Sequence, residues 1–305
     1  MKHDRHHDHD HGAHDRRYAG RAFALGIGLN LAFVVVEAVY GVLAHSMALL
    51  ADAGHNLSDV LALTLAWGAS TLARRGPSER FTYGLRSSSI LVALLNAALL
   101  LVVTGGIAWE AINRLTMPSP VAGETVIWVA LVGILINGAS AMLFARDRQH
   151  DVNMRGAFLH LAADAAVSLG VVVAGIGILL TGWLWLDPLT GLGIAVGIVW
   201  STWGLLRDSV ALALNAVPEH IDPRLVRTYL SKLAGVTEVH DLHIWAMSTT
   251  ETALTVHLVV PGGHPGDAFV AEICKELRTR YRVHHSTIQI ETGAQPCELA
   301  PDHVV

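Results

Sequence analysis

MALLADAGHNLSDVLALTLAWGASTL, residues 47–72, is an apolar stretch that carries two acids and a histidine. A helix that crosses a bilayer needs roughly 20 mainly apolar residues, so this stretch is long enough to span. His55 and Asp59 lie four residues apart, which puts both side chains on one face of that helix. A charge in the hydrocarbon costs about 2.5–3.5 kcal/mol on insertion scales, so such residues mark a pathway or a functional site.

A second apolar stretch, residues 157–181, repeats the same spacing with His160 and Asp164. If the two faces meet, they supply two imidazoles and two carboxylates, the ligand number and type of a tetrahedral zinc site. The pattern therefore predicts a transport site for a divalent cation at His55, Asp59, His160 and Asp164. The alternative is that the four only form hydrogen bonds between helices and hold a bundle together.

The chain around these pairs has the composition of a membrane protein. Of its 305 residues, 52% are hydrophobic and 15% charged, against about a quarter charged in soluble domains. Six apolar stretches predict an α-helical membrane protein with six transmembrane helices, and no signal peptide precedes the first. They cover residues 22–43, 47–72, 88–110, 122–145, 157–181 and 183–206.

Lys and Arg residues predict how these helices are oriented. Twelve of them fall in the segments on one side, and only Arg114 falls on the other. Because basic residues gather on the cytoplasmic side, both termini of a multi-pass membrane protein are expected in the cytoplasm. The twelve are Lys2, Arg5, Arg16, Arg17, Arg21, Arg74, Arg75, Arg80, Arg86, Arg146, Arg148 and Arg155.

The two ends of the chain are polar. Residues 1–18 hold six histidines among aspartates and are expected to form a disordered, metal-avid cytoplasmic tail, or a tail whose histidines are incidental. Residues 19–210 form the predicted membrane domain. Residues 211–293 predict a cytoplasmic α+β domain of ferredoxin-like type with the order α-β-β-α-β, able to pair with a second copy. Residues 294–305 are expected to be a tail.

Histidines recur in this C-terminal domain. His240 and His257 fall on neighbouring predicted strands, and a third strand brings His284 or His285 and Glu291 near them, with Cys297 following. These residue types predict a zinc or regulatory site, although histidines on a solvated sheet face are the alternative. Two cysteines make no disulfide framework and suit a reducing compartment.

Metal binding requires neutral imidazole and ionised carboxylate, so it displaces protons. We therefore expect zinc to be exchanged for protons at the two His-x-x-x-Asp pairs, in an antiport mechanism. Asp52 lies one turn before His55, and support, gate and helix-cap roles stay open for it. The remaining polar residues of the apolar stretches are expected to make packing hydrogen bonds; they are Asn30, Glu37, Asn96 and Asn137.

Several words of the sequence resemble the cation diffusion facilitator family, zinc transporter branch, over about residues 18–293. They are SMALLADAGHNLSD (46–59), RFTYGLRSSSILVALLNA (80–97), NMRGAFLHLAADAAVSLG (153–170), WLDPLTG (185–191), VHDLHIW (239–245) and HHSTIQIE (284–291). The resemblance implies a homodimeric exporter of divalent metal in the cell inner membrane, with a metallochaperone-like cytoplasmic domain.

The resemblance also implies particular ligands. It places the transport site on the same four residues and favours zinc over cadmium because His55 is a histidine. It places the cytoplasmic site on His240, His257 and Glu291, with Gln289 where relatives carry a histidine, so that His284 would have to substitute. Zinc would then be both transported substrate and regulatory ligand.

Other functional classes fit the pattern less well. An intramembrane metalloenzyme would keep an open coordination position and a glutamate base beside the pairs, so the chain is not expected to be an enzyme. A membrane-anchored zinc sensor would not need the two intramembrane pairs. A passive channel would show weaker, multi-site ligation. The basic residues form no long run, which excludes a nucleic-acid partner.

Overall fold

The computed structural model describes residue 28 and residues 30–73, 75–145 and 152–301. Its contacts divide the chain into two units, one made of Met1–Leu63 and Ala98–Thr202 and the other of Thr64–Ala97 and Trp203–Val305. The predicted His-rich tail, residues 1–18, lies outside the described residues. The other domain limits drawn from the sequence stay a prediction.

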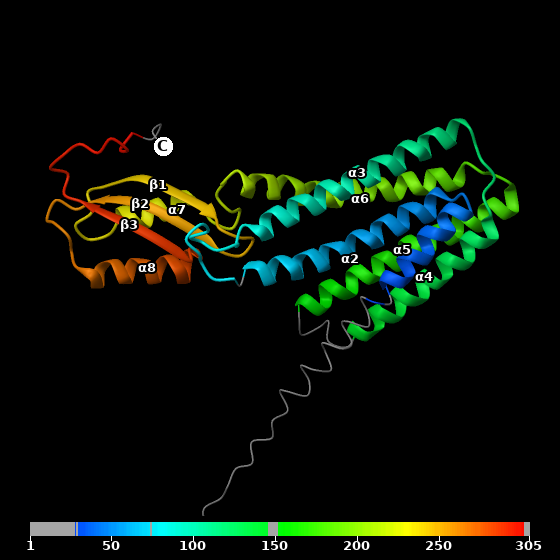
Figure 1. Cartoon of the computed structure of the whole chain (residues 1–305), viewed down its shortest axis with the longest axis horizontal. Helices are drawn as coiled ribbons and strands as arrows, with labels where there is room; N and C mark the ends of the chain where they lie inside the picture. Colours follow the sequence, from blue (N-terminus) through cyan, green and yellow to red (C-terminus); the bar gives the residue numbers. More distant parts are fainter. Residues whose placement is uncertain (1–27, 29, 74, 146–151, 302–305) are drawn as a thin grey trace, which may run out of the picture. The chain divides into compact units, whose positions relative to one another are not determined.

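Long helices account for most of the first unit and continue into the second (Figure 1). The first helix covers Asn30–Leu43, and five labelled helices follow it. They are α2 (Met47–Ala73), α3 (Ser88–Thr116), α4 (Gly123–Phe144), α5 (Val152–Thr181) and α6 (Leu186–Ala213).

Four of the described helices, α3 to α6, contain stretches long and apolar enough to cross a membrane. Large apolar side chains on them are exposed, such as Leu180 (80%) and Trp200 (86%), as expected of surfaces that face lipid. The first helix is apolar but short within the described residues. α2 has 27 residues and carries Asp52, His55, Asn56 and Asp59; it is not among the four.

The N-terminus of α2 is held by a residue 140 positions away. Asp187, in the first turn of α6, accepts hydrogen bonds from the backbone N–H of Met47 at 2.6 Å and of Ala48 at 3.3 Å, and from the Ser46 hydroxyl. Carboxylates stabilise helix N-termini by satisfying unpaired N–H groups and opposing the helix dipole. Gly191 permits the close approach, because a Cβ there would lie 2.9 Å from the Met47 carbonyl.

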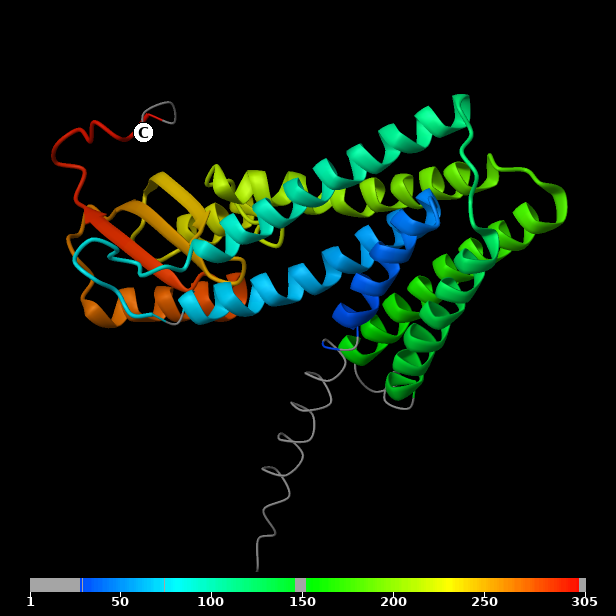
Figure 2. The ribbon, with the colours of Figure 1, turned by 45° about the vertical axis from the view of Figure 1, so that its right-hand side comes forward.

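Helices α4 and α5 lie side by side (Figure 2). Small residues allow this approach: a Cβ on Gly175 would lie 2.8 Å from Ile127 of α4. Val126, Val129 and Val171 are buried at this contact. Close packing of small and β-branched residues is how helices associate where no hydrophobic driving force acts between them.

The C-terminal part has the order α-β-β-α-β, as predicted. α7 (Pro223–Ser231) is capped by Asp222, which accepts from the N–H of Arg224 at 2.8 Å, and is followed by β1 (Glu238–Ala246) and β2 (Thr252–Val259). Then come α8 (Asp267–Tyr281) and β3 (His285–Glu291). The sheet order is β1-β2-β3, with β1 and β2 antiparallel and β2 and β3 parallel.

One apolar core joins these elements. Val226 and Leu230 of α7, and Ile273 and Leu277 of α8, pack with alternate residues of β2, among them Leu254, Val256 and Leu258. The period of two along the strand turns those side chains to one face. His257 therefore points to the opposite face of the sheet from Val256 and Leu258.

Candidate metal centre

The two His-x-x-x-Asp pairs lie on facing helices. His55 and Asp59 are on α2, and His160 and Asp164 are on α5. The contacts cross between the helices: His55 Nε2 lies 3.2 Å from Asp164 Oδ1, and His160 Nε2 lies 3.2 Å from Asp59 Oδ2. His160 Nε2 is also 3.7 Å from Asp164 Oδ2. We call these four residues the helical quartet.

The helical quartet has the spacing of a metal site. Each of His55, Asp59 and Asp164 offers a ligand atom, and these atoms lie within 4.8 Å of one another. His160 joins the group through its contacts with both aspartates, and the centroids of the two imidazole rings are 6.2 Å apart. Asp164 is 3% exposed, whereas His160 is exposed, so one side of the quartet is open.

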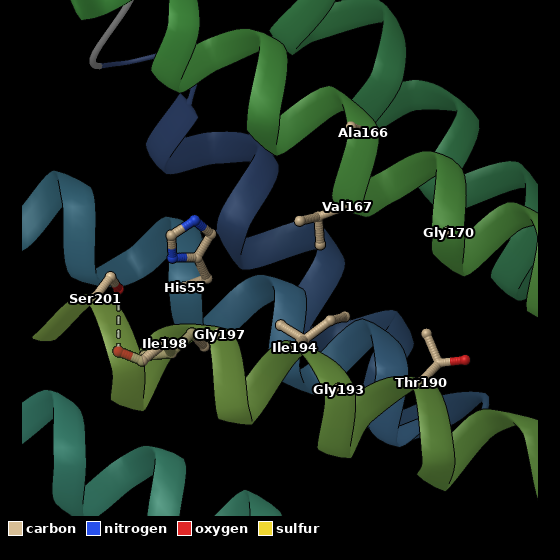
Figure 3. A pocket seen from close by; sticks show the side chains of 10 residues that line it. All are labelled: His55, Ala166, Val167, Gly170, Thr190, Gly193, Ile194, Gly197, Ile198 and Ser201. Atoms are coloured by element: carbon tan, nitrogen blue, oxygen red, sulfur yellow. Dashed lines mark hydrogen bonds between the residues drawn. The ribbon is translucent and has the colours of Figure 1, made fainter.

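A cavity of about 460 Å³ borders the quartet at His55. Its other walls come from α5 and α6, and His55 stands between these two helices (Figure 3). Thr190 and Ser201 line it, but their hydroxyls donate to carbonyls of their own helix at 2.8 and 3.0 Å. His55 is thus the one titratable group among the ten lining residues.

Glycines create much of this cavity. A Cβ built on Gly170 of α5, or on Gly193 or Gly197 of α6, would meet no atom within 4 Å. The remaining lining residues are small or aliphatic: Ala166, Val167, Ile194 and Ile198. The space is thus bordered by small and aliphatic residues and by the imidazole of His55, which belongs to the quartet.

Polar residues left open by the sequence lie next to the quartet. Asp52 of α2 accepts a hydrogen bond from Ser168 of α5 at 2.9 Å, and Asn56 donates to Glu37 of the first helix at 3.1 Å. Asp52 and Glu37 are both 0% exposed. The sequence predicted only packing hydrogen bonds for Glu37. The feature that could have indicated more is an acid in an otherwise apolar stretch.

A second group of ligating residues lies on the sheet. The four are His240 (β1), His257 (β2), Glu291 (β3) and Cys297, and we call them the sheet cluster; their ligand atoms lie within 4.8 Å of one another. Glu291 reaches His240 Nε2 at 3.3 Å and His257 Nδ1 at 3.0 Å. Cys297 Sγ is 3.7 Å from His257 Nδ1.

Strand register assembles the sheet cluster. His240 pairs with His257 across β1 and β2, and Glu291 pairs with Val259 two residues further along β2. A β-bulge follows His240, with Asp241 at a positive φ of 49°. Bulges of this kind re-aim side chains, and here Asp241 reaches His257 Nε2 at 3.3 Å.

His284 does not join the sheet cluster. Its ring Nδ1 accepts a hydrogen bond from the backbone N–H of Thr252 at 3.2 Å, and its backbone N–H donates to the Thr252 carbonyl at 2.8 Å. His284 precedes β3 and Glu291 ends that strand, so the two residues lie about 20 Å apart at the rise of a β-strand. Cys297 stands where the sequence analysis expected His284. His243 and His285 contact Asp241 and Tyr83 instead.

The donor set of the sheet cluster suits zinc. Both ring nitrogens of His240 are buried and make no hydrogen bond to a described group, although carboxylate oxygens of Glu238 and Glu291 lie 3.4 and 3.3 Å from them. Desolvation opposes ionisation of Glu291, but hydrogen bonds from Gln289 and Cys297 and the charges of His240 and His257 lower its pKa. Two imidazoles, one carboxylate and one thiol are ligands that structural zinc sites use.

Comparison with known protein families agrees with this organisation. The cation efflux transmembrane domain matches residues 24–212, and the cytoplasmic domain of cation efflux proteins matches residues 218–293. The zinc transporter ZitB of Escherichia coli (strain K12) is 36% identical over 304 residues, which are 99% of this chain and 95% of that protein.

Further relatives carry related names. The metal cation efflux system protein CzcD of Cupriavidus metallidurans is 34% identical over 96% of this chain and 92% of its own length. The cadmium, cobalt and zinc/H(+)-K(+) antiporter of Bacillus subtilis (strain 168) is 32% identical over 94% of this chain and 92% of its own. The chain therefore belongs to the cation efflux, or cation diffusion facilitator, family of membrane transporters.

Proposed function

We propose that the protein exports a divalent metal ion, with zinc as its main substrate, in exchange for protons at the helical quartet. The observation that carries the proposal is that four ligating side chains from two helices converge within a helical unit otherwise rich in apolar residues. Zinc transporters of 34–36% identity support zinc as the substrate.

Charge explains why a dication belongs there. Asp59 and Asp164 together carry two negative charges when ionised, and such charges are costly in the bilayer without compensation. One Zn²⁺ neutralises both, and two imidazoles complete a tetrahedral set. Because the imidazoles must be neutral and the carboxylates ionised for binding, protons and metal compete for the same four residues. This competition is the basis of antiport.

The cavity beside His55 supports an access route to the quartet. It lies between α5 and α6 and borders the imidazole of His55. No other titratable group is among its lining residues. We propose that the route serves one of the two faces of an alternating-access transporter. Glycines along it let neighbouring helices approach closely, which suits helices that slide during the cycle.

Topology and assembly form the next part of the proposal. Six spanning helices, counting the first helix and α2, place both termini in the cytoplasm, in line with twelve basic residues on one side against Arg114 on the other. The match of residues 218–293 to the cytoplasmic domain of cation efflux proteins supports a homodimer in a bacterial inner membrane.

We further propose that the sheet cluster binds zinc in the cytoplasm as a regulatory ligand, through His240, His257, Glu291 and Cys297. The buried nitrogens of His240, which make no hydrogen bond to a described group and have Glu291 3.3 Å from Nε2, support this assignment. Asp241, against the far nitrogen of His257, would orient that ring as carboxylates do behind metal-bound histidines.

The test uses the full chain in proteoliposomes with a zinc-sensitive dye inside and an imposed pH gradient. We expect zinc flux that depends on the gradient in the parent and is lost in Asp59→Asn and in Asp164→Asn. Asp208→Asn is the matched control, since Asp208 is an exposed acid paired with Arg207 at 3.3 Å. Flux that persists in either quartet variant contradicts the shared site, and parent flux that ignores the pH gradient contradicts antiport.

A further inference from the structure

Glu37 and Asp52 form a buried pair of acids outside the helical quartet. Glu37 lies on the first helix and Asp52 on α2, and both are 0% exposed. Each has one oxygen that accepts a hydrogen bond, Glu37 Oε2 from Asn56 at 3.1 Å and Asp52 Oδ2 from Ser168 at 2.9 Å. We call Glu37 and Asp52 the acid pair.

The other oxygen of each acid is the informative one. Glu37 Oε1 and Asp52 Oδ1 are buried and have no hydrogen-bond partner among the described groups. Asp52 lies four residues before Asn56, the donor to Glu37, so both acids lie at the same face of α2. Two carboxylates offer only acceptors, so neither can satisfy the other while both are ionised. One proton supplies the missing donor and removes one of two adjacent negative charges.

The charged surroundings indicate where that proton belongs. Asp52 accepts from Ser168 and has His55 of the quartet nearby, and both favour its anion, whereas Asp164 opposes it. The charged group that faces Glu37 is Asp52 itself. No Lys or Arg among the described residues contributes to either acid. The proton therefore belongs on Glu37.

Hydrogen bonds connect the acid pair to both helices of the quartet. Asn56, the donor to Glu37, follows His55 directly on α2. Ser168, the donor to Asp52, lies one helical turn after Asp164 on α5. A proton gained or lost at Glu37 thus changes the hydrogen bonds at the two helix segments that carry the metal ligands.

We propose that the acid pair is a proton-binding site separate from the metal ligands, and that Glu37 gives up one proton when the metal binds and regains it when the metal leaves. The proposal rests on metal/proton exchange at the quartet. The step is balanced: Glu37 releases H⁺ to water and becomes a carboxylate as a dication arrives nearby, and the reverse follows metal release.

The first experiment counts protons released per zinc bound by the full chain in detergent, with a pH dye in weak buffer. In Glu37→Gln we expect the count to fall by about one, because that proton no longer titrates. Zinc affinity at pH 7 should fall by about tenfold or more, because Gln stands for the protonated acid and a proton that leaves on binding opposes binding while it is present. Glu124→Gln, an exposed acid at the start of α4, is the matched control and should keep the parent count.

Three outcomes separate the possibilities. A parent that releases no protons contradicts the exchange mechanism itself. A parent that releases protons together with an unchanged count in Glu37→Gln overturns only the acid pair. An unchanged zinc affinity in Glu37→Gln also overturns it, because a proton that must leave for the metal to bind weakens binding while it stays.

A measurement on the unsubstituted chain covers the case in which Glu37→Gln does not fold. Infrared difference spectra with and without zinc, with side-chain ¹³C-labelled glutamate, report on protonated glutamate alone. We expect a carbonyl band of a protonated carboxyl that shifts with the label and disappears on zinc addition. A spectrum without a label-sensitive carboxyl band would overturn the proposal.

Discussion

The helical quartet and the sheet cluster hold similar ligands but are assembled in different ways. The quartet takes two residues from each of two continuous helices, and each pair is four residues apart. The sheet cluster takes one residue from each of three strands and one, Cys297, from beyond the last strand. A helical pair is set by local spacing, whereas the sheet set depends on register, a bulge and the path of a tail. The difference predicts two sites that act independently.

The largest effect should come from breaking the quartet alone. In Asp164→Asn we expect zinc flux to fall by about 100-fold or more, because a buried carboxylate ligand is replaced by a weak neutral one. Zinc bound at the sheet cluster should be unaffected. Flux assays and zinc titrations on the same preparation measure both quantities, and a parallel loss of zinc at the sheet would contradict independence.

The sheet cluster can be tested by exchanging the two candidates for its fourth ligand. We expect Cys297→Ser to weaken zinc binding by about 10- to 100-fold and His284→Asn to leave it within about twofold. Titrations use the full chain carrying Asp59→Asn, so that the quartet does not contribute. If His284→Asn causes the larger loss of zinc affinity, Cys297 is not the fourth ligand.

The access route can be tested within one position of the cavity. Gly193 has open space around its Cβ direction, so Gly193→Ala should be tolerated, whereas Gly193→Leu fills part of the space next to His55. We expect zinc flux to be about tenfold lower in Gly193→Leu than in Gly193→Ala, because the leucine obstructs the path while the quartet stays intact. Equal flux in both variants would show that metal reaches the quartet elsewhere.

The smallest effect concerns the support of α2. Asp187→Ala removes the acceptor for the N–H groups of Met47 and Ala48, which should cost about 1–2 kcal/mol of stability, as for other helix caps. Thermal unfolding of the detergent-solubilised chain measures it. Asp208→Ala, at an exposed acid, should leave the unfolding temperature unchanged. An equal shift in both variants would reduce the Asp187 contact to a surface-charge effect.

Much of this organisation followed from the sequence. The spacing of His55 with Asp59, and of His160 with Asp164, is a local property of an α-helix, since residues four apart share a face. Alternating β-branched residues and turn signals predicted α7, the three strands and α8 in their order. The first helix and α2 are the two spans whose count stays a proposal, because neither is among the four described helices that are long and apolar enough to cross a membrane.

Tertiary structure decided the contacts between distant segments. Sequence adjacency placed His284 beside the strand that carries Glu291, but the strand's rise moves it to the opposite end, and Cys297 returns to the cluster. The hydrogen bond from Met47 to Asp187 joins residues 140 positions apart, and the bond from Asn56 to Glu37 joins α2 to the first helix. Periodicity fixes which face of one element a side chain occupies; only the packing of several elements brings two such faces together.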